Sequence, residues 1–408
     1  MHPRPRETKL LARRHQILNM VFREKQASRF ALARSLNINA SMVGTYVEEF
    51  LREGLLVEDH SGTTRRGRAP IPIRPNPDYG CFLGLDFEAL RARAVLADFA
   101  GDILHQKEIA FRADITRACV LDRIVALARA TAENTKGKPL LCVGVAAPGQ
   151  VDSVNGRVIH YALLPDFSEV PVQNYFEKHF GAPVFVEDNI RALTFAEMLR
   201  GAGRGRDNFL CLSVRSGVGL GIVIDRRIYA GTDSMAGEVG YTVFRTSAGP
   251  QTMTELISAK GIVSQALRAL KSAQTTKTRK ALLQKGDDLS LPEIVEAADT
   301  GDALLRDLLK EVGRNLGLVT ANLANLFSPE KIVLAGEVPR CYPLVRDTRQ
   351  RAFRRYTLVQ ILKNTYLDWG VLTGFAAALG AAYLGFSKTF PDEERIVALE
   401  GPGERNAI

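Results

Sequence analysis

Residues 184–197 read VFVEDNIRALTFAE, and the interpretation of the whole chain starts from this stretch. An apolar run at 184–186 is followed by three polar residues, Glu187, Asp188 and Asn189, and then by a pattern of helical period. That order predicts a strand that carries polar side chains to the edge of a sheet, where a helix begins. Asp188 and Asn189 are therefore candidate binding residues, and the alternative is that they only cap the helix.

Strands and helices alternate on both sides of this stretch. The strands are predicted from short apolar runs between turn residues, and the helices from apolar residues at helical spacing. Their order predicts a protein of the α/β class. We expect strands at 82–87, 93–98, 103–111, 140–147, 209–214 and 220–225, and long helices at 116–135 and 308–327.

The length of 408 residues suggests two or three domains of about 150 residues each, and 46% hydrophobic residues suffice for their cores. No run of about 18 apolar residues occurs and no apolar segment follows the basic N-terminus, so neither a membrane span nor a signal peptide is expected. The five cysteines are scattered without a C-x-x-C pair, which argues against a disulfide framework or a cysteine-bound zinc ion. We expect a cytoplasmic protein.

Positive charge is concentrated at the N-terminal end. The first 75 residues contain 14 Lys/Arg and 7 Asp/Glu, which gives +7 of the chain's total of +9. Such asymmetry is typical of a segment that binds nucleic acid. On charge alone, a solvated basic arm is the alternative.

The same end of the chain has the pattern of three helices and a wing. Residues 14–23 predict a first helix, Ser28 caps a second and Asn39 caps a third. A short strand at 55–57 and a basic tip at 61–68 follow. We therefore predict a winged helix-turn-helix that binds double-stranded DNA, and a three-helix protein-interaction module is the alternative.

Small side chains lie opposite the apolar face of the third predicted helix, where they allow close approach to base edges in the major groove. The flexible tip adds arginines that suit phosphate contacts. Prolines within 72–78 predict a stiff linker to the next domain. The expected DNA-binding residues are Ala40, Ser41, Gly44 and Thr45 on the helix and Arg65, Arg66 and Arg68 in the wing.

Several motifs resemble those of the ROK family (repressors, open reading frames and sugar kinases). The opening stretch is similar to V-E-N-D-A-N-A-A-x-x-A-E, VAAPGQVD at 145–152 is similar to G-x-P-G-x-V-D, and AGEVGY at 236–241 is similar to A-G-E-I-G-H. RGRAP at 66–70 resembles the G-G-R-P wing of ROK regulators, which implies that Arg68 enters the minor groove. The resemblance covers nearly the whole chain.

The resemblance implies a winged helix-turn-helix and linker at 1–78, followed by an actin-like (ribonuclease H-like) domain at 79–408. That domain is expected to comprise one lobe at about 79–188, a second at about 189–385 and a C-terminal tail. It further implies a binding site for a sugar-like effector. Its residues are Gly149, Asp188, Asn189, Glu238, Tyr241 and Glu255. A structural role for Glu238 and Glu255 as capping or ion-paired residues is the alternative.

The motifs also depart from those of an active kinase. In ROK kinases the Asp of the Asn-Asp pair is the general base, and Asn189 stands at its position; a neutral carboxamide cannot accept the proton. The phosphate hairpins D-x-G-x-T and G-T-G-x-G appear as DFEAL at 86–90 and RSGVG at 215–219. Tyr241 stands in place of the zinc-binding His and 245–253 contains no cysteine, so neither zinc nor another cofactor is expected.

These features favour a DNA-binding transcriptional regulator, in particular a repressor, of carbohydrate genes. Its inactive ROK domain would bind an effector and form a homodimer or a dimer of dimers on an inverted-repeat operator. The main alternative is a sugar kinase with an appended DNA-binding domain. A third possibility is that the ROK domain serves only for dimerisation and binds no ligand.

Overall fold

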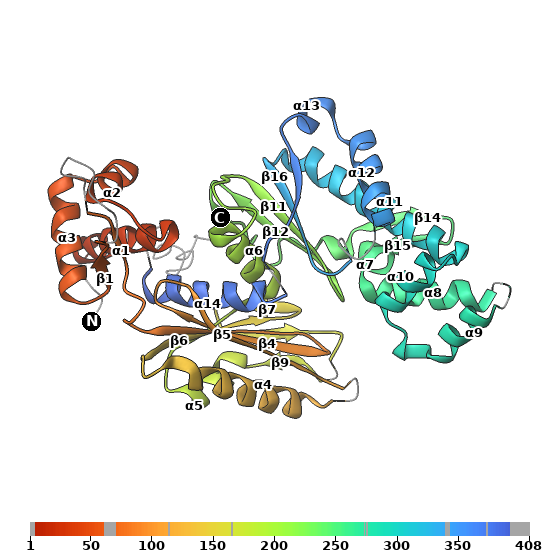
Figure 1. The fold of residues 1–408 in the computed structure, drawn as a ribbon, viewed down its shortest axis with the longest axis horizontal. Helices are drawn as coiled ribbons and strands as arrows, with labels where there is room; N and C mark the ends of the chain where they lie inside the picture. The colour runs from red at the N-terminus through yellow and green to blue at the C-terminus, as the bar shows by residue number, and fades with distance from the viewer. Residues whose placement is uncertain are drawn as a thin grey trace, which may run out of the picture. The chain divides into compact units, whose positions relative to one another are not determined.

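The computed structural model describes residues 5–60, 71–112, 115–164, 166–272, 274, 276–338, 343–372 and 374–391. The chain forms two compact units, Met1–Ala196 with Phe375–Ile408, and Glu197–Gly374. This grouping differs from the lobes expected from the sequence, because helix α14 (Ala376–Thr389) packs on the sheet of the first unit (Figure 1). The α/β class is confirmed.

The N-terminal part of the first unit consists of three helices and a two-stranded sheet. Side chains cap the second and third helices, since Ser28 Oγ accepts a hydrogen bond from the backbone N–H of Ala31 and Asn39 Oδ1 accepts one from Ser41. A three-residue turn with Asn37 in the left-handed conformation joins these two helices. The elements are α1 (Pro5–Glu24), α2 (Arg29–Leu36), α3 (Ala40–Arg52), β1 (Leu56–Glu58) and β2 (Ile73–Pro75).

Residues 72–78 are not only the stiff linker expected from the sequence. Strand β2 lies within them and pairs antiparallel with β1. The backbone N–H and C=O of Ile73 also bond to Ala27, and Pro75, which lacks an N–H, occupies the end of the strand. The prolines therefore delimit a strand of the wing.

A five-stranded sheet forms the body of the first unit, in the order β10-β6-β3-β4-β5. Strands β3, β4 and β5 form an antiparallel meander, while β6 pairs parallel with β3 and β10 pairs parallel with β6. Helix α14 covers one face, and α4 (Arg117–Ala132) and α5 (Val172–Phe180) lie on the other. The strands are β3 (Cys81–Phe87), β4 (Arg91–Asp98), β5 (Ile103–Ala110), β6 (Leu140–Ala147) and β10 (Val184–Asp188).

Smaller elements complete the first unit. A three-stranded sheet of β7 (Gln150–Asp152), β8 (Arg157–His160) and β9 (Ser168–Val170) follows β6. Helix α6 (Asn189–Arg200) begins directly after β10. The predicted strand followed by a helix at 184–197 is thus present.

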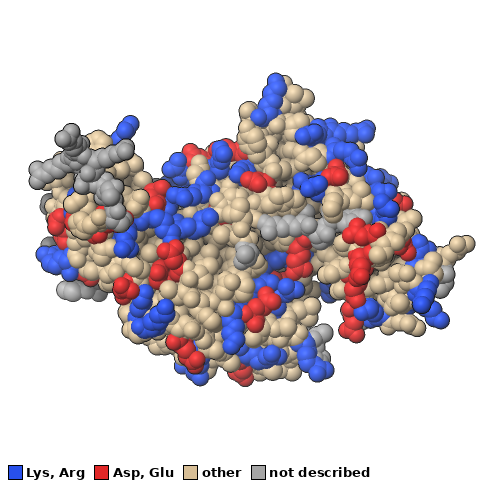
Figure 2. Space-filling model, in the orientation of Figure 1, with Lys and Arg blue, Asp and Glu red and all other residues tan. Residues whose placement is uncertain are grey.

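The second unit contains a sheet of similar construction, in the order β13-β12-β11-β16-β17. Its long helices α11 (Ala303–Phe327) and α12 (Pro343–Tyr356) pack against each other. Basic side chains gather over α12 (Figure 2), whose exposed arginines include Arg346, Arg351 and Arg354. The strands are β11 (Phe209–Val214), β12 (Val218–Ile224), β13 (Arg227–Ile228), β16 (Lys331–Ala335) and β17 (Tyr366–Trp369).

Further helices and a hairpin complete the second unit. The hairpin consists of β14 (Val243–Thr246) and β15 (Gly249–Thr252). The helices are α7 (Met253–Ile257), α8 (Ala259–Ser272), α9 (Lys277–Gln284), α10 (Leu291–Asp299) and α13 (Val359–Leu362). In the described part of the chain, no helix combines the length and hydropathy that crossing a bilayer requires.

Candidate functional site

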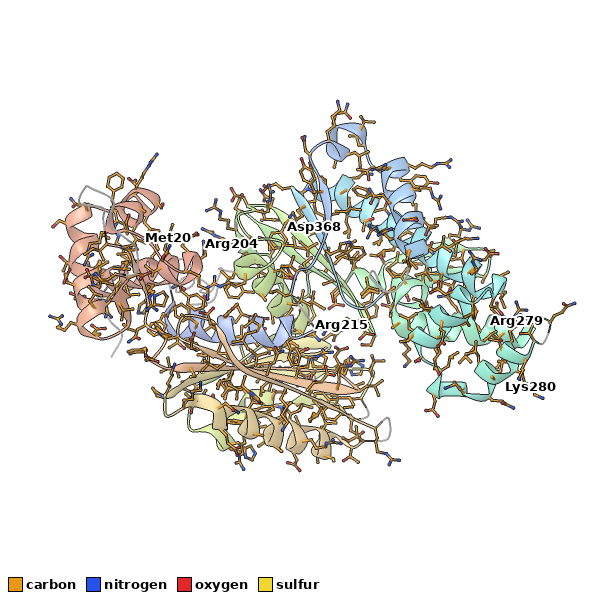
Figure 3. The ribbon with its side chains drawn as sticks, in the orientation of Figure 1. Met20, Arg204, Arg215, Arg279, Lys280 and Asp368 are labelled. Atoms are coloured by element: carbon orange, nitrogen blue, oxygen red, sulfur yellow. The ribbon has the colours of Figure 1, made fainter. Side chains whose placement is uncertain are left out.

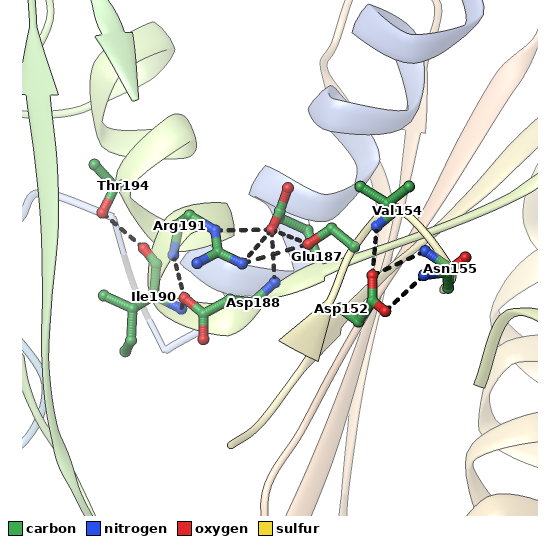
Figure 4. A network of polar contacts seen from close by, with 9 residues as sticks. Asp152, Val154, Asn155, Glu187, Asp188, Ile190, Arg191 and Thr194 are labelled. Atoms are coloured by element: carbon green, nitrogen blue, oxygen red, sulfur yellow. Dashed lines mark hydrogen bonds and ion pairs between the residues drawn. The ribbon is translucent and has the colours of Figure 1, made fainter. Parts of the chain in front are cut away.

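Asp188 ends β10 (Figure 4), Asn189 begins α6, and the two residues have different roles. Oδ1 of Asp188 accepts hydrogen bonds from the backbone N–H groups of Ile190 at 3.1 Å and Arg191 at 2.9 Å, so Asp188 caps α6. Asn189 is the first residue of the helix and is 8% exposed. Its carboxamide has no hydrogen-bond partner among the described residues, which leaves its donor and acceptor atoms for a ligand.

Glu187 binds Arg191 through a nearly buried ion pair beside these residues. The Oε1 atom of Glu187 lies 2.7 Å from Nη2 and 2.8 Å from Nε of Arg191, and it accepts a hydrogen bond from Ser153 Oγ at 2.6 Å. We name these three residues, with Asp188 and Asn189, the β10–α6 cluster. Arg191 was not among the candidate residues from the sequence, although an acid four residues before a base across a helix start indicates such a pair.

Burial and charge shift the two carboxyl groups of the cluster in opposite directions. Burial raises the pKa of Glu187, but the charges of Arg191 and Lys388 and the hydrogen bond from Ser153 outweigh it, and the pKa of Glu187 falls below its usual value. Burial raises the pKa of Asp188 above its usual value despite its contacts with Arg191. The cluster thus combines an ionised Glu187 with a capping Asp188 whose proton affinity is increased.

Gly149 lies in the turn between β6 and β7, at a φ of 80°. A Cβ atom at this position would lie 2.3 Å from the carbonyl oxygen of His160. The backbone conformation and the close approach both require glycine here. Its presence is explained without a ligand.

The other predicted effector residues belong to the second unit. Glu238 immediately precedes a short 3-10 helix at Val239–Tyr241. Glu255 forms a capping box in α7, because its Oε2 accepts hydrogen bonds from the backbone N–H and hydroxyl of Thr252, and these bonds lower its pKa. Tyr241, which stands in place of the family's histidine, is 67% exposed, so its ring is not packed in the interior of the unit.

An internal arginine neutralises the acid of the first altered phosphate hairpin. Nη1 of Arg93 lies 3.6 Å from Oε1 of Glu88 and 3.4 Å from Oδ2 of Asp86, and Nε lies 2.5 Å from Oε2 of Glu108. Glu88 and Arg93 are 8% and 5% exposed. The acid that replaces the family glycine is therefore part of a buried ion-pair network.

The second altered hairpin carries Arg215 at the turn between β11 and β12 (Figure 3). The backbone N–H of Arg215 donates to the carbonyl of Gly217 at 2.9 Å, and its carbonyl accepts from the N–H of Ala259 at the start of α8. The turn is thus closed by its own backbone and by α8. The N–H of Arg215, which could otherwise donate to a phosphate, is therefore used within the turn.

The β14–β15 hairpin occupies the stretch where ROK proteins commonly hold zinc. Thr246 Oγ1 donates to the carbonyl of Gly249 at 2.8 Å, which closes the hairpin without a metal. We predict that the purified protein contains no stoichiometric zinc and that a chelator leaves its melting temperature unchanged. Elemental analysis checks this, and about one zinc ion per chain would contradict it.

The predicted DNA-binding residues of α3 lie on its exposed side. Ala40, Ser41 and Thr45 are exposed and Gly44 is partly exposed, whereas Val43, Val47 and Phe50 on the opposite side are buried. The hydroxyl of Thr45 donates to the carbonyl of Ser41 at 3.1 Å, so it retains acceptor capacity. The wing residues Arg65, Arg66 and Arg68 lie outside the described residues.

Gly44→Ala is expected to have opposite effects on the stability of α3 and on the affinity for DNA. No atom lies within 4 Å of a Cβ built at Gly44, so the methyl group fits and is expected to stabilise α3 by about 0.5–1 kcal/mol. The predicted docking of α3 in the major groove places this methyl group against base edges, and we expect operator affinity to fall about tenfold. Thermal melting and a binding titration check the two effects, and unchanged affinity would remove Gly44 from the interface.

Three N-terminal helices with a short sheet precede the two-unit α/β body, and this body has an actin-like, sugar-kinase-type fold. The sequence profile of the ROK family matches residues 82–387. The chain belongs to the ROK family, and the resemblance noted in the sequence is confirmed.

Three similar proteins span most of the chain. The xylose repressor of Caldicellulosiruptor bescii is 23% identical over 92% of this chain and 96% of its own. The crystal structure of a ROK family transcriptional regulator described as a homologue of Escherichia coli Mlc has a TM-score of 0.77 and 22% identity, and it covers 97% of this chain and 100% of its own. A Streptomyces griseus ROK glucokinase, solved with glucose and AMPPNP, has a TM-score of 0.63 and 28% identity over 75% of this chain and 99% of its own.

Proposed function

We propose that the protein is a sequence-specific DNA-binding repressor of carbohydrate genes, whose ROK body binds a sugar-like effector, dimerises and transfers no phosphate. The observation that carries the proposal is the joining of α3, with its exposed face of small residues, to a ROK body whose base position and phosphate hairpins are altered. The similarity to a xylose repressor extends over 92% of the chain and supports the same reading.

The β10–α6 cluster supports effector binding. The unpaired carboxamide of Asn189 suits sugar hydroxyls, which both donate and accept hydrogen bonds. Asp188 retains Oδ2 as an acceptor, because only its Oδ1 caps the helix. Gly149, Glu238, Tyr241 and Glu255 stay predicted effector residues, and the capping box of Glu255 leaves only its Oε1 for that role.

The same residues support the absence of kinase activity. Asn189 cannot take the proton of an attacking hydroxyl, and Asp188 is held by the backbone N–H groups of α6 with its carboxyl group directed to the cap. Glu88 is buried in an ion-pair network where a kinase has glycine for phosphate. No cofactor is required by this proposal.

Selection of bound DNA from a random pool tests the proposal on the full chain. A homodimer that presents two copies of α3 to successive major grooves is expected to enrich an inverted repeat with half-sites one or two helical turns apart. Repeating the selection with D-xylose, D-glucose or N-acetylglucosamine identifies an effector by loss of the enriched sequence. Equal recovery of all sequences in every arm would overturn the regulator proposal.

Melting experiments separate an effector-binding body from one that serves only for dimerisation. A sugar that binds the folded state raises stability by RT ln(1 + [L]/Kd), so the melting temperature rises with its concentration. Asn189→Ala is the matched variant and is expected to abolish that rise. A panel of sugars and sugar phosphates that leaves the melting temperature unchanged would favour the dimerisation role.

A further inference from the structure

Helix α1 of the winged helix-turn-helix is packed directly on helix α14 of the ROK body. The ring of Phe22 stacks on that of Phe386 with centroids 3.9 Å apart and an interplanar angle of 15°, and it meets the edge of Tyr383 at 5.6 Å. Phe22, Phe386 and Tyr383 are at most 2% exposed. Burial of these rings holds α1 in one place on α14, which a flexible linker alone would not do.

Polar contacts surround this aromatic contact. Lys25, at the end of α1, donates to the carbonyl of Ala100 at 2.9 Å and pairs with Asp102 in the β4–β5 turn. Asn19 Nδ2 donates to the carbonyl of Phe390 at 2.7 Å, just beyond α14. These bonds tie both the turn and the end of α14 to α1, and they fix its orientation as well as its position.

The other side of α14 contacts the elements that carry the β10–α6 cluster. A Cβ atom on Gly380 would lie 1.8 Å from the carbonyl oxygen of Ala192 in α6, so the two helices meet backbone to backbone. Near the opposite end of α14, the Nζ atom of Lys388 lies 6.0 Å from the ring centroid of Phe185 in β10. The charge of Lys388 also helps to lower the pKa of Glu187.

Close packing leaves α14 little freedom to absorb a shift of its neighbours. Gly84 of β3 approaches it as closely as Gly380 approaches α6, since a Cβ on Gly84 would lie 1.8 Å from the carbonyl oxygen of Ala378. In a closely packed interior, a shift of one element moves the elements that are packed against it. A displacement of the start of α6 therefore reaches α14, and through Phe386 it reaches α1.

We propose that α14 couples the β10–α6 cluster to the DNA-binding helices, with Phe22 as the residue that positions α1 according to the state of the cluster. The regulatory role of this coupling rests on the proposed function, whereas the contacts of α14 with α1 and α6 are independent of it. Binding of a sugar at Asn189 changes the contacts at the start of α6 and so shifts α14. The shift of α14 in turn moves α1, which packs with α3. Phe22 does not touch DNA in this scheme.

Hydrogen exchange of the full chain tests the coupling without any ligand. Asn189→Asp adds a charge to the cluster with almost no change in size, and we expect at least a twofold change in the exchange rates of amides in residues 15–24. In the Phe22→Leu background the same substitution is expected to leave those rates unchanged. Phe30→Leu is the matched control, because Phe30 lies on α2 and is 71% exposed, and it should preserve the response.

Operator affinity provides a second measurement on the same set of variants. Uncoupled sites give additive effects, within about twofold in the dissociation constant. We expect Asn189→Asp and Phe22→Leu to deviate from additivity by at least threefold, and Asn189→Asp with Phe30→Leu to be additive. If the full chain shows no sequence preference for DNA, the proposed function fails, and the hydrogen-exchange rates of residues 15–24 alone decide whether the coupling exists. Exchange rates in residues 15–24 that do not respond to Asn189→Asp would overturn the coupling.

Discussion

Replacing Arg191 by methionine is expected to lower the free energy of unfolding by about 3–5 kcal/mol at pH 7. The side chains of Arg191 and Glu187 are 8% and 18% exposed, so the change leaves a largely buried carboxylate without its ion-pair partner. Chemical denaturation monitored by circular dichroism measures the loss. The hydrogen bond from Ser153 and the charge of Lys388 remain, and we do not expect them to replace the guanidinium.

Two control variants distinguish this mechanism from a general loss of packing. Glu187→Gln combined with Arg191→Met removes both charges and is expected to recover part of the stability. Arg314→Met breaks a pair with Glu311 whose side chains are 55% and 49% exposed, and it is expected to cost less than about 1 kcal/mol. Equal losses for Arg191→Met and Arg314→Met would contradict the buried ion pair.

The loss caused by Arg191→Met is also expected to depend on pH. The folded state lowers the pKa of Glu187, so the stability that Glu187 contributes is complete above its unfolded pKa of about 4.3 and is lost as pH falls through the folded value. Without Arg191, burial raises this pKa and the carboxyl takes up a proton. The difference in free energy of unfolding between the unmodified chain and Arg191→Met is therefore expected to narrow below about pH 4. A difference that does not change with pH would exclude titration of Glu187 as its source.

Incubation with ATP and any hexose or N-acetylhexosamine is expected to yield no sugar phosphate at the turnover of ~1 s⁻¹ that kinases reach. Loss of the general base alone removes a factor of about 10²–10⁴. The buried Glu88–Arg93 pair stands where the first phosphate hairpin has glycine, and the N–H of Arg215 in the second hairpin is engaged within its own turn. A coupled assay for ADP and direct detection of sugar phosphate together measure the activity.

Asn189→Asp is the matched control for the kinase prediction. It restores a carboxylate of the same size at the base position and leaves both altered hairpins in place, so we expect it to stay inactive. Activity in this variant alone would show that the base was the single missing group. Phosphorylation by the unmodified chain at ~1 s⁻¹ would make the sugar-kinase alternative correct.

The amino-acid sequence by itself determined the elements and the class of the fold. Apolar periodicity, with Ser28 and Asn39 as caps, predicted the three N-terminal helices, and the strand at 140–147 coincides with β6. Such features depend on residues within one or two turns or strands, so a local pattern is sufficient to encode them. The family motifs and the substitutions at Asn189, Glu88 and Arg215 were visible in the same way.

Only the tertiary structure decided which residues act together. Ser153 reaches Glu187 from the turn after β7. Arg93 of β4 contacts three carboxylates, one in β3, one just after β3 and one in β5. Phe22 stacks on Phe386, which lies far from it in the sequence. It also decided that Tyr241 is exposed and that α14 belongs to the first unit. These outcomes depend on how whole elements pack, and a periodic pattern specifies which face of an element is buried but not which partner buries it.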